Sequence, residues 1–282
     1  MKRIVGWLLS SSIFASFCAL ALCLGAEELL LAHHAAKAFG INYDVQSWNH
    51  PLHFLVFGAT LLEYNAHFLL NTKGTGIPVL GAYLLALTGG SLCAMALPGM
   101  PLTVMILLGS LGLLAVLYST PYIPFRPKRR INDYGITKIL VLTVTWVAMT
   151  TILPSLYLGF TWHVLSHEIV LRTLLIFPLC LAFDLRDYES DKAKGIQTIA
   201  GALGEVKSYK IIYINLLILI VTGLIFLFTG AIIFPHFIAV AVAALLAFCS
   251  VRFARKAQHP FIYSGLIDGV MLVYGLLVWV LL

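Results

Sequence analysis

Apolar residues fill most of the chain in long runs that few polar residues interrupt. A helix needs about 20 apolar residues to cross the hydrocarbon core of a bilayer. Pro98, Pro101 and Pro121 lie at helix ends, because proline lacks the backbone donor that a continuing helix needs. The runs predict nine membrane-spanning helices, at residues 4–26, 52–70, 77–97, 101–120, 138–159, 164–184, 209–229, 231–251 and 262–282. We therefore expect an all-α, polytopic integral membrane protein, with residues 1–282 forming a single transmembrane domain.

The composition supports the same class. Of the 282 residues, 61% are hydrophobic and 11% are charged, and the mean hydropathy is +0.97. A soluble domain carries about 25% charged residues. These values exclude a soluble globular enzyme, a disordered chain and a nucleic-acid-binding module, so the net charge of +6 does not indicate a nucleic-acid partner. The expected surroundings are the lipid bilayer.

The first 26 residues resemble a signal peptide, because Lys2 and Arg3 precede an apolar run and Ala19-Leu20-Ala21 offers small residues for cleavage. The run is also long enough to span a bilayer. We expect it to be retained as the first transmembrane helix.

Lysine and arginine concentrate on one side of the predicted bundle. With the N-terminus in the cytoplasm, 16 of the 18 basic residues fall in cytoplasmic segments, and only Lys37 and Arg172 fall elsewhere. Cytoplasmic loops of membrane proteins are enriched in these residues. The pattern therefore predicts a cytoplasmic N-terminus and an external C-terminus, and we expect the bacterial inner membrane as the location.

Two of the cytoplasmic loops carry candidate chemistry. Residues 121–138 hold five basic residues and one acid, whereas residues 184–210 hold five of each. Asp184, Asp187 and Asp191 are spaced i, i+3, i+7, which places them on one face of a helix. Carboxylates so close repel one another unless a cation compensates. They predict an Mg2+ site for a phosphate-bearing substrate, while an ordinary basic loop and a solvated helix end remain the alternative.

Residues 184–204, DLRDYESDKAKGIQTIAGALG, resemble the second aspartate-rich motif of the UbiA superfamily of intramembrane prenyltransferases. The basic loop fits as well: Tyr118-Ser119 followed by Arg126, Lys128 and Arg129 is similar to the family's segment after its fourth helix. Nine helices with both loops in the cytoplasm also match the family's architecture.

The resemblance implies an Mg2+-dependent prenyltransferase that moves an isoprenoid group from a prenyl diphosphate to a membrane-associated acceptor. The acceptor is expected to be aromatic and similar to a quinone precursor. Asp184, Asp187 and Asp191 take the catalytic and metal-binding roles. The side chains expected to bind the diphosphate are Arg126, Lys128, Arg129, Lys192, Lys194 and Tyr118.

The second predicted helix departs from the family. Its cytoplasmic end, residues 61–71, reads LLEYNAHFLLN and contains no aspartate, whereas the family places its first acidic motif there. One alignment puts Asn65 on that motif's asparagine. Glu63, His67 and Asn71 are spaced i, i+4, i+8 and could form a weaker polar or metal-binding face opposite Asp184; a hydrogen-bonded pair at a helix end is the alternative.

This departure supports a second hypothesis, a non-catalytic relative of the same fold that binds an isoprenoid or another lipid. A transporter is a third and less favoured hypothesis, because transporters place acids near the midplane. Within the predicted spans, Glu168 and Arg172 are spaced i, i+4 and are expected to neutralise each other. Asp268 lies inside the ninth span and is either functional or hydrogen-bonded to a neighbouring helix.

Overall fold

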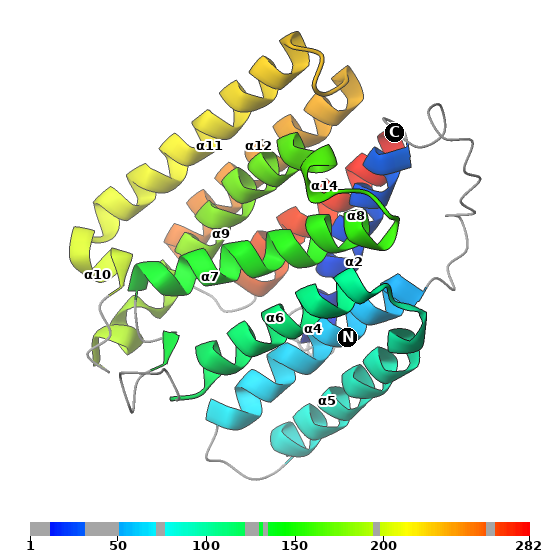
Figure 1. The fold of residues 1–282 in the computed structure, drawn as a ribbon. Helices are drawn as coiled ribbons and strands as arrows, with labels where there is room; N and C mark the ends of the chain where they lie inside the picture. The colour runs from blue at the N-terminus through cyan, green and yellow to red at the C-terminus, as the bar shows by residue number, and fades with distance from the viewer. Residues whose placement is uncertain are drawn as a thin grey trace, which may run out of the picture.

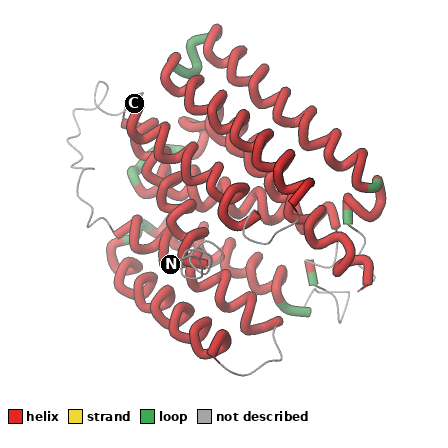
Figure 2. Tube along the Cα trace, turned by 180° about the vertical axis from the view of Figure 1, so that it is seen from behind, coloured by secondary structure: helices red, strands yellow, loops and turns green. Residues whose placement is uncertain are grey.

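The computed structural model describes residues 12–31, 51–71, 77–121, 130–131, 135–193, 198–257 and 263–282. Within these residues the secondary structure is helical and includes no strand (Figure 2). The elements are α2 (Ser12–Leu30), α4 (Pro51–Asn71), α5 (Ile77–Ala96), η2 (Leu97–Gly99), α6 (Leu102–Ser119), α7 (Gly135–Val147), η4 (Ala148–Ile152), α8 (Leu153–Tyr157), η5 (Trp162–Leu165), α9 (Ser166–Ala193), α10 (Ile199–Leu203), α11 (Glu205–Phe228), α12 (Phe234–Ala257), η6 (Tyr263–Ile267) and α14 (Asp268–Leu281). The predicted all-helical class is confirmed.

Each predicted apolar run overlaps a helix in the described residues. In the part of the chain that the structure describes, six segments are long and apolar enough to cross a membrane. They are α2, α5 with η2, α6, α7 through α8, α11 and α12. The runs at α4, α9 and α14 are helical too, but they carry more polar residues or are shorter, so the count of nine crossings stays a prediction.

Helices α2, α9 and α12 continue well beyond their predicted C-terminal ends, α12 as far as Ala257. Helix α2 continues past Ala26 to Leu30, and the buried Glu27 lies 2.8 Å from Nε2 of His53 on α4. Helix α9 continues past Asp184 to Ala193 and carries the whole acidic cluster as regular helix.

The polar ends of the helices gather at one end of the bundle, on the left in Figure 1. The last turns of α4, α6, α9 and α12 lie there with the first turns of α7 and α11. Ion pairs join some of them: Lys138 of α7 contacts Asp191 of α9, and Arg255 of α12 lies 3.5 Å from Glu205 of α11. Helices that cross a membrane in alternating directions bring the ends of some and the starts of others to the same side, as seen here.

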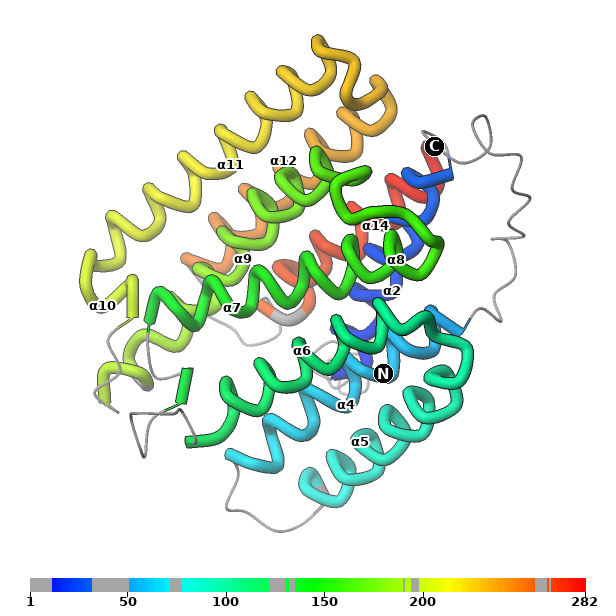
Figure 3. Tube along the Cα trace, in the orientation of Figure 1, coloured from blue at the N-terminus to red at the C-terminus, as the bar shows by residue number. Residues whose placement is uncertain are grey.

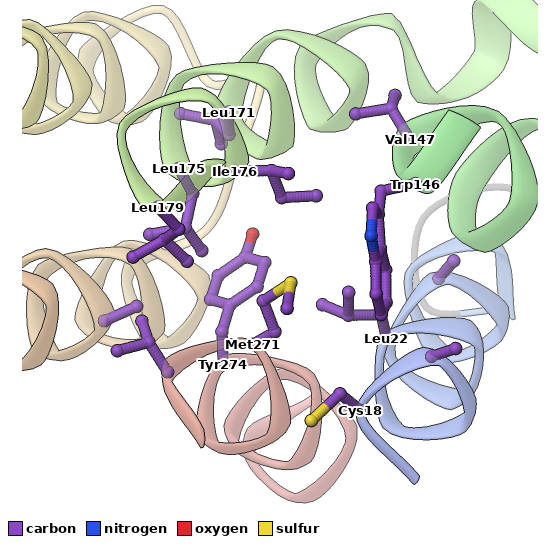
Figure 4. Close-up of a cluster of buried hydrophobic side chains, with 14 of the residues drawn as sticks. Cys18, Leu22, Trp146, Val147, Leu171, Leu175, Ile176, Leu179, Met271 and Tyr274 are labelled. Carbon is purple, nitrogen blue, oxygen red and sulfur yellow. The ribbon is translucent and has the colours of Figure 1, made fainter. Parts of the chain in front are cut away.

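The core is built from the facing sides of α2, α7, α9 and α14. Figure 4 shows Leu22, Trp146, Ile176 and Met271 pointing into one space together with the ring of Tyr274. All five are buried. Removing their apolar surface from lipid gains little, so close packing between helices must hold the bundle together.

Glycines permit two close helix contacts. A β-carbon at Gly275 of α14 would lie 2.3 Å from the backbone carbon of Ala21 on α2, and α2 and α14 run side by side in Figure 3. A β-carbon at Gly89 of α5 would lie 2.6 Å from the carbonyl oxygen of Gly58 on α4. Small residues at such crossings let helix backbones approach, as is typical of membrane helices.

Large apolar side chains cover the outside of α5, α6 and α11. Met95 is 79% exposed, Leu102 68% and Phe228 85%. Exposed apolar surface on this scale is unfavourable in water, but it is the surface that a bilayer requires. The exposed faces therefore support membrane insertion.

Candidate functional site

The last three turns of α9 bring two of the predicted acids to one cation. Nζ of Lys138, in the first turn of α7, lies 3.6 Å from Oδ1 of Asp184 and 3.2 Å from Oδ2 of Asp191. The two aspartates are seven residues apart, or about two helical turns, so both can face α7. Asp184 and Asp191 are buried, and the side chain of Lys138 is 15% exposed.

Asp187 has a different partner. Its Oδ1 and Oδ2 accept hydrogen bonds of 2.8 and 3.0 Å from Nε and Nη2 of Arg186, the preceding residue. In the described ranges, no group of three or more histidine, cysteine, aspartate or glutamate side chains is arranged to hold one metal ion. The structure therefore groups Asp184 with Asp191 and leaves Asp187 half-exposed beside them.

The acidic pair nevertheless has the chemistry of a metal site. Neither carboxylate oxygen of Asp184 accepts a hydrogen bond of ordinary geometry from a described residue, although both oxygens are buried. A buried carboxylate is costly unless a cation or hydrogen bonds satisfy it. Carboxylate oxygens are the ligands that Mg2+ prefers. Asp184 and Asp191 thus fit a divalent ion, and Lys138 supplies the countercharge in this structure.

Arg186 is a second cation at the site. Its guanidinium lies 4.9 Å from the ring centroid of Phe183 and 5.6 Å from that of Tyr263. Burial lowers the pKa of Arg186, but the hydrogen bonds and charge of Asp187 outweigh burial and hold this pKa above its usual value. The charge of Arg186 also acts on Asp268, at the start of α14. Arg186 therefore stays charged between two acids.

Lys138 and Arg186 are cations of the site that the sequence did not predict. Lys138 is the last basic residue of the segment 121–138, and Arg186 lies inside the acidic motif. No spacing pointed to Lys138, because it is 53 residues from Asp191 along the chain. Arg186 adjoins Asp187, so this pairing is local.

Two of the predicted diphosphate ligands, Lys192 and Tyr118, lie in the described residues. Lys192 is exposed, and its ammonium lies 5.7 Å from the ring centroid of Tyr188. Tyr118 is buried, and its ring centroid lies 5.5 Å from that of His67. Four of the predicted ligands fall outside the described residues: Arg126, Lys128, Arg129 and Lys194.

At the end of α4, hydrogen bonds connect this helix to α6 and to Arg130. Nδ1 of His67 lies 2.8 Å from Oγ of Ser119 on α6. Asn71 donates to the carbonyl of His67 over 2.7 Å, and Arg130 donates to Oδ1 of Asn71. At this helix end, where the resemblance implies an acidic motif, a histidine therefore contacts Ser119 and an asparagine binds a cation.

The other polar residues of α4 point elsewhere. Asn65 is buried and donates to Oγ of Ser12 on α2 over 2.7 Å and to the carbonyl of Leu61 over 2.6 Å. Asn65 therefore ties α4 to α2. Glu63 is half-buried, and its charge acts on the hydroxyl of Tyr118. The structure thus joins His67 to Asn71 and assigns Asn65 to a helix contact.

A second polar cluster lies on α9 away from these ends. Glu168 and Arg172 form the predicted ion pair, which is confirmed, and both are fully buried. Tyr274 of α14 donates to Oε2 of Glu168 over 2.9 Å, and Nε2 of His236 on α12 lies 3.1 Å from the same oxygen. The cluster therefore links three helices.

The backbone beside this cluster explains the other contact of Arg172. Pro154 cannot donate a hydrogen bond to the carbonyl four residues earlier, that of Thr150. Arg172 donates to this carbonyl over 2.6 Å. Thr150 lies in the π-helical segment η4, an irregularity that often accompanies a proline or a functional site.

These features define a polytopic α-helical membrane protein with an acidic site and several cations at one end of its bundle. Residues 76–261 match the model of the UbiA prenyltransferase family, which covers more than half of the chain. The chain belongs to this family. A comparison with curated protein sequences finds no significant match.

Solved structures share the fold at low sequence identity. A digeranylgeranylglyceryl phosphate synthase is 14% identical, with 99% of this chain and 98% of that chain covered and a TM-score of 0.58. A UbiA homologue from Archaeoglobus fulgidus bound to GPP and Mg2+ is 13% identical, with coverages of 96% and 99% and a TM-score of 0.55. The same homologue bound to DMAPP and Mg2+ is 14% identical, with the same coverages and a TM-score of 0.51.

Proposed function

We propose that this protein is an Mg2+-dependent intramembrane prenyltransferase, which transfers an isoprenoid group from a prenyl diphosphate to an acceptor held at the membrane. One observation carries the proposal: Asp184 and Asp191, two buried acids, converge on a single cation at the polar end of a bundle that belongs to the UbiA prenyltransferase family. Solved proteins of the same fold have been captured with GPP or DMAPP and Mg2+.

In this proposal Asp184, Asp187 and Asp191 hold Mg2+. When bound, the ion neutralises charge on the diphosphate as it leaves. Lys192, Lys194 and the basic residues Arg126, Lys128 and Arg129 bind phosphate oxygens, and Tyr118 donates a hydrogen bond to them. Arg130 joins these cations, because Asn71 already orients its guanidinium at the end of α4.

The chemistry follows from the placement of charge. The bond between the allylic carbon and the diphosphate oxygen breaks, and its electron pair leaves with the diphosphate. Fixed cations stabilise this developing charge more than the charge of the bound substrate, so they accelerate the step. The apolar interior excludes water from the carbocation. A carbon of the proposed aromatic acceptor then forms the new bond and releases its proton.

The proposed location is the bacterial inner membrane, with the acidic site facing the cytoplasm and the C-terminus outside. Prenyl diphosphates carry a charged head and an apolar tail. The polar end of the bundle suits the head, and the lipid-facing apolar helices suit lateral entry of the tail.

A second candidate is a relative that binds prenyl diphosphate without turnover. The hydrogen bonds at the end of α4 favour it, because the resemblance implies an acidic motif there, whereas His67 contacts Ser119 and Asn71 accepts a hydrogen bond from Arg130. This candidate and the enzyme share the diphosphate site and differ only in product formation.

Binding of geranyl thiodiphosphate, a slowly reacting analogue, tests the proposal. Wild type should bind it with Mg2+ and lose binding in chelator. Asp184→Asn and Asp191→Asn keep the side-chain shape but remove a charged ligand, so each should weaken binding roughly 10- to 100-fold. Asp187→Asn is measured beside them, because Asp187 contacts Arg186 in this structure.

Glu205→Gln is the matched control, because Glu205 is exposed at the same end of the bundle. It should bind like wild type. Equal and metal-independent binding by all variants would refute the site. Metal-dependent binding without diphosphate release, across a panel of quinone-precursor acceptors, would favour the binding relative.

A further inference from the structure

Lys138 occupies the position between Asp184 and Asp191 from which one cation can reach both carboxylates. Its Nζ is 3.2 Å from one carboxylate and 3.6 Å from the other. Asp184 and Asp191 therefore already have a countercharge in this structure. We infer that Lys138 is a built-in competitor of the divalent ion: it neutralises the acids in the free protein and yields them to the ion when a diphosphate binds.

The inference rests on the proposed function, and the geometry supports each of its steps. Without a cation, two buried carboxylates two turns apart on the same helix face would repel each other. An ammonium is a compact charge on a flexible four-carbon stem. It can therefore leave the acids without a change in the backbone of α7. The Lys138 side chain keeps some exposed surface, which gives it room to move toward the polar end.

A bound diphosphate gives the ammonium of Lys138 a new partner. It is more negative than either carboxylate, and two further cations lie at this end of the bundle, Arg130 beside Asn71 and Arg186 beside Asp187. Once Lys138 turns to the phosphate oxygens, Asp184 and Asp191 are free to bind the ion. Binding of diphosphate and binding of Mg2+ should then strengthen each other, and this coupling must be reciprocal.

Mg2+ binding isotherms of the full-length protein in detergent, without diphosphate, test the competition directly. Wild type should bind Mg2+ weakly. Lys138→Met removes the competing charge and should bind Mg2+ roughly tenfold more tightly or better, since an interaction with a charged group is lost from the competing state. Lys138→Arg keeps the charge and should stay close to wild type. Lys207→Met is the matched control, because Lys207 is exposed on α11, and its Mg2+ affinity should not differ from that of wild type.

Thermal unfolding gives a second readout that does not depend on binding heats. Lys138→Met should unfold at a lower temperature than wild type in chelator, because its acids lack a countercharge. Mg2+ should raise its unfolding temperature more than that of wild type. If Lys138→Met is recovered only in the presence of Mg2+ and unfolds on chelation, the inference is supported in the same way.

Two outcomes overturn the inference. Either Lys138→Met binds Mg2+ no more tightly than wild type, or Lys138→Arg gains affinity as Lys138→Met does, which would remove charge as the cause. Geranyl thiodiphosphate at saturating Mg2+ separates this failure from failure of the proposed function. Metal-dependent thiodiphosphate binding with unchanged Mg2+ affinity in Lys138→Met rejects the role of Lys138 alone. Tighter Mg2+ binding without any thiodiphosphate binding supports the competition and rejects the prenyl diphosphate site.

Discussion

The guanidinium of Arg172 forms an ion pair with the carboxylate of Glu168 one turn earlier on α9, and neither side chain has any exposed surface. Isolated charges are rarely tolerated within a bilayer. Here each charge is satisfied by several groups, because Tyr274 also donates to Glu168 and Arg172 also donates to the carbonyl of Thr150. The pair therefore acts as a structural junction between helices.

Replacing one member of this pair should destabilise the protein strongly. Arg172→Met leaves Glu168 buried without its main countercharge, and breaking a buried pair in this way costs about 3–5 kcal/mol. Denaturant unfolding in detergent measures the effect. The double variant Glu168→Gln with Arg172→Met should recover part of the loss, because no unpaired charge remains. Arg255→Met is the control: its pair with Glu205 is exposed, so the expected loss is at most about 1 kcal/mol.

The adjacent glycines of α5 should respond in opposite ways to the same substitution. A β-carbon at Gly89 would collide with the backbone of α4, whereas one at Gly90 would meet nothing within 4 Å. Gly89→Ala should therefore destabilise the bundle by about 1–3 kcal/mol. Gly90→Ala should be neutral or slightly stabilising, since alanine is the better helix former. Equal unfolding temperatures for the two variants would contradict the close packing of α4 on α5.

Two asparagines on α4 should separate function from stability. Asn71 orients Arg130 at the polar end, whereas Asn65 is buried against α2. Asn71→Leu should weaken geranyl thiodiphosphate binding several-fold with little loss of stability. Asn65→Leu should destabilise the fold by about 1–3 kcal/mol through its lost hydrogen bonds, while the folded fraction keeps its affinity. Both are measured by unfolding and by binding per folded molecule, and the reverse pattern would reject this assignment.

The orientation in the membrane can be tested by cysteine labelling in a background without the five native cysteines. Single cysteines at positions 128 and 194 should react with an impermeant reagent only after the cells are permeabilised. A cysteine in place of Thr229, in the exposed turn between α11 and α12, should react in intact cells. Labelling of position 128 or 194 in intact cells would invert the proposed topology.

Local pattern was enough to predict the features that depend on neighbours along one helix. The apolar runs predicted the helices, because a span of about 20 apolar residues has few alternatives in a bilayer. The i, i+4 spacing of Glu168 and Arg172 predicted their ion pair, since such residues share a helix face. The residues of the acidic motif were sufficient to predict the family to which the chain belongs.

The sequence by itself therefore determined the fold class, the helix positions and the location of the acids, since each follows from the period of one helix. Only the tertiary structure decided which charges meet across different helices. Lys138 reaches Asp191 across 53 residues, and Tyr274 reaches Glu168 across 106. It also placed Asn65 against α2. These partners depend on how each helix is rotated and packed against the next, and close approaches such as Gly275 on Ala21 fix that rotation.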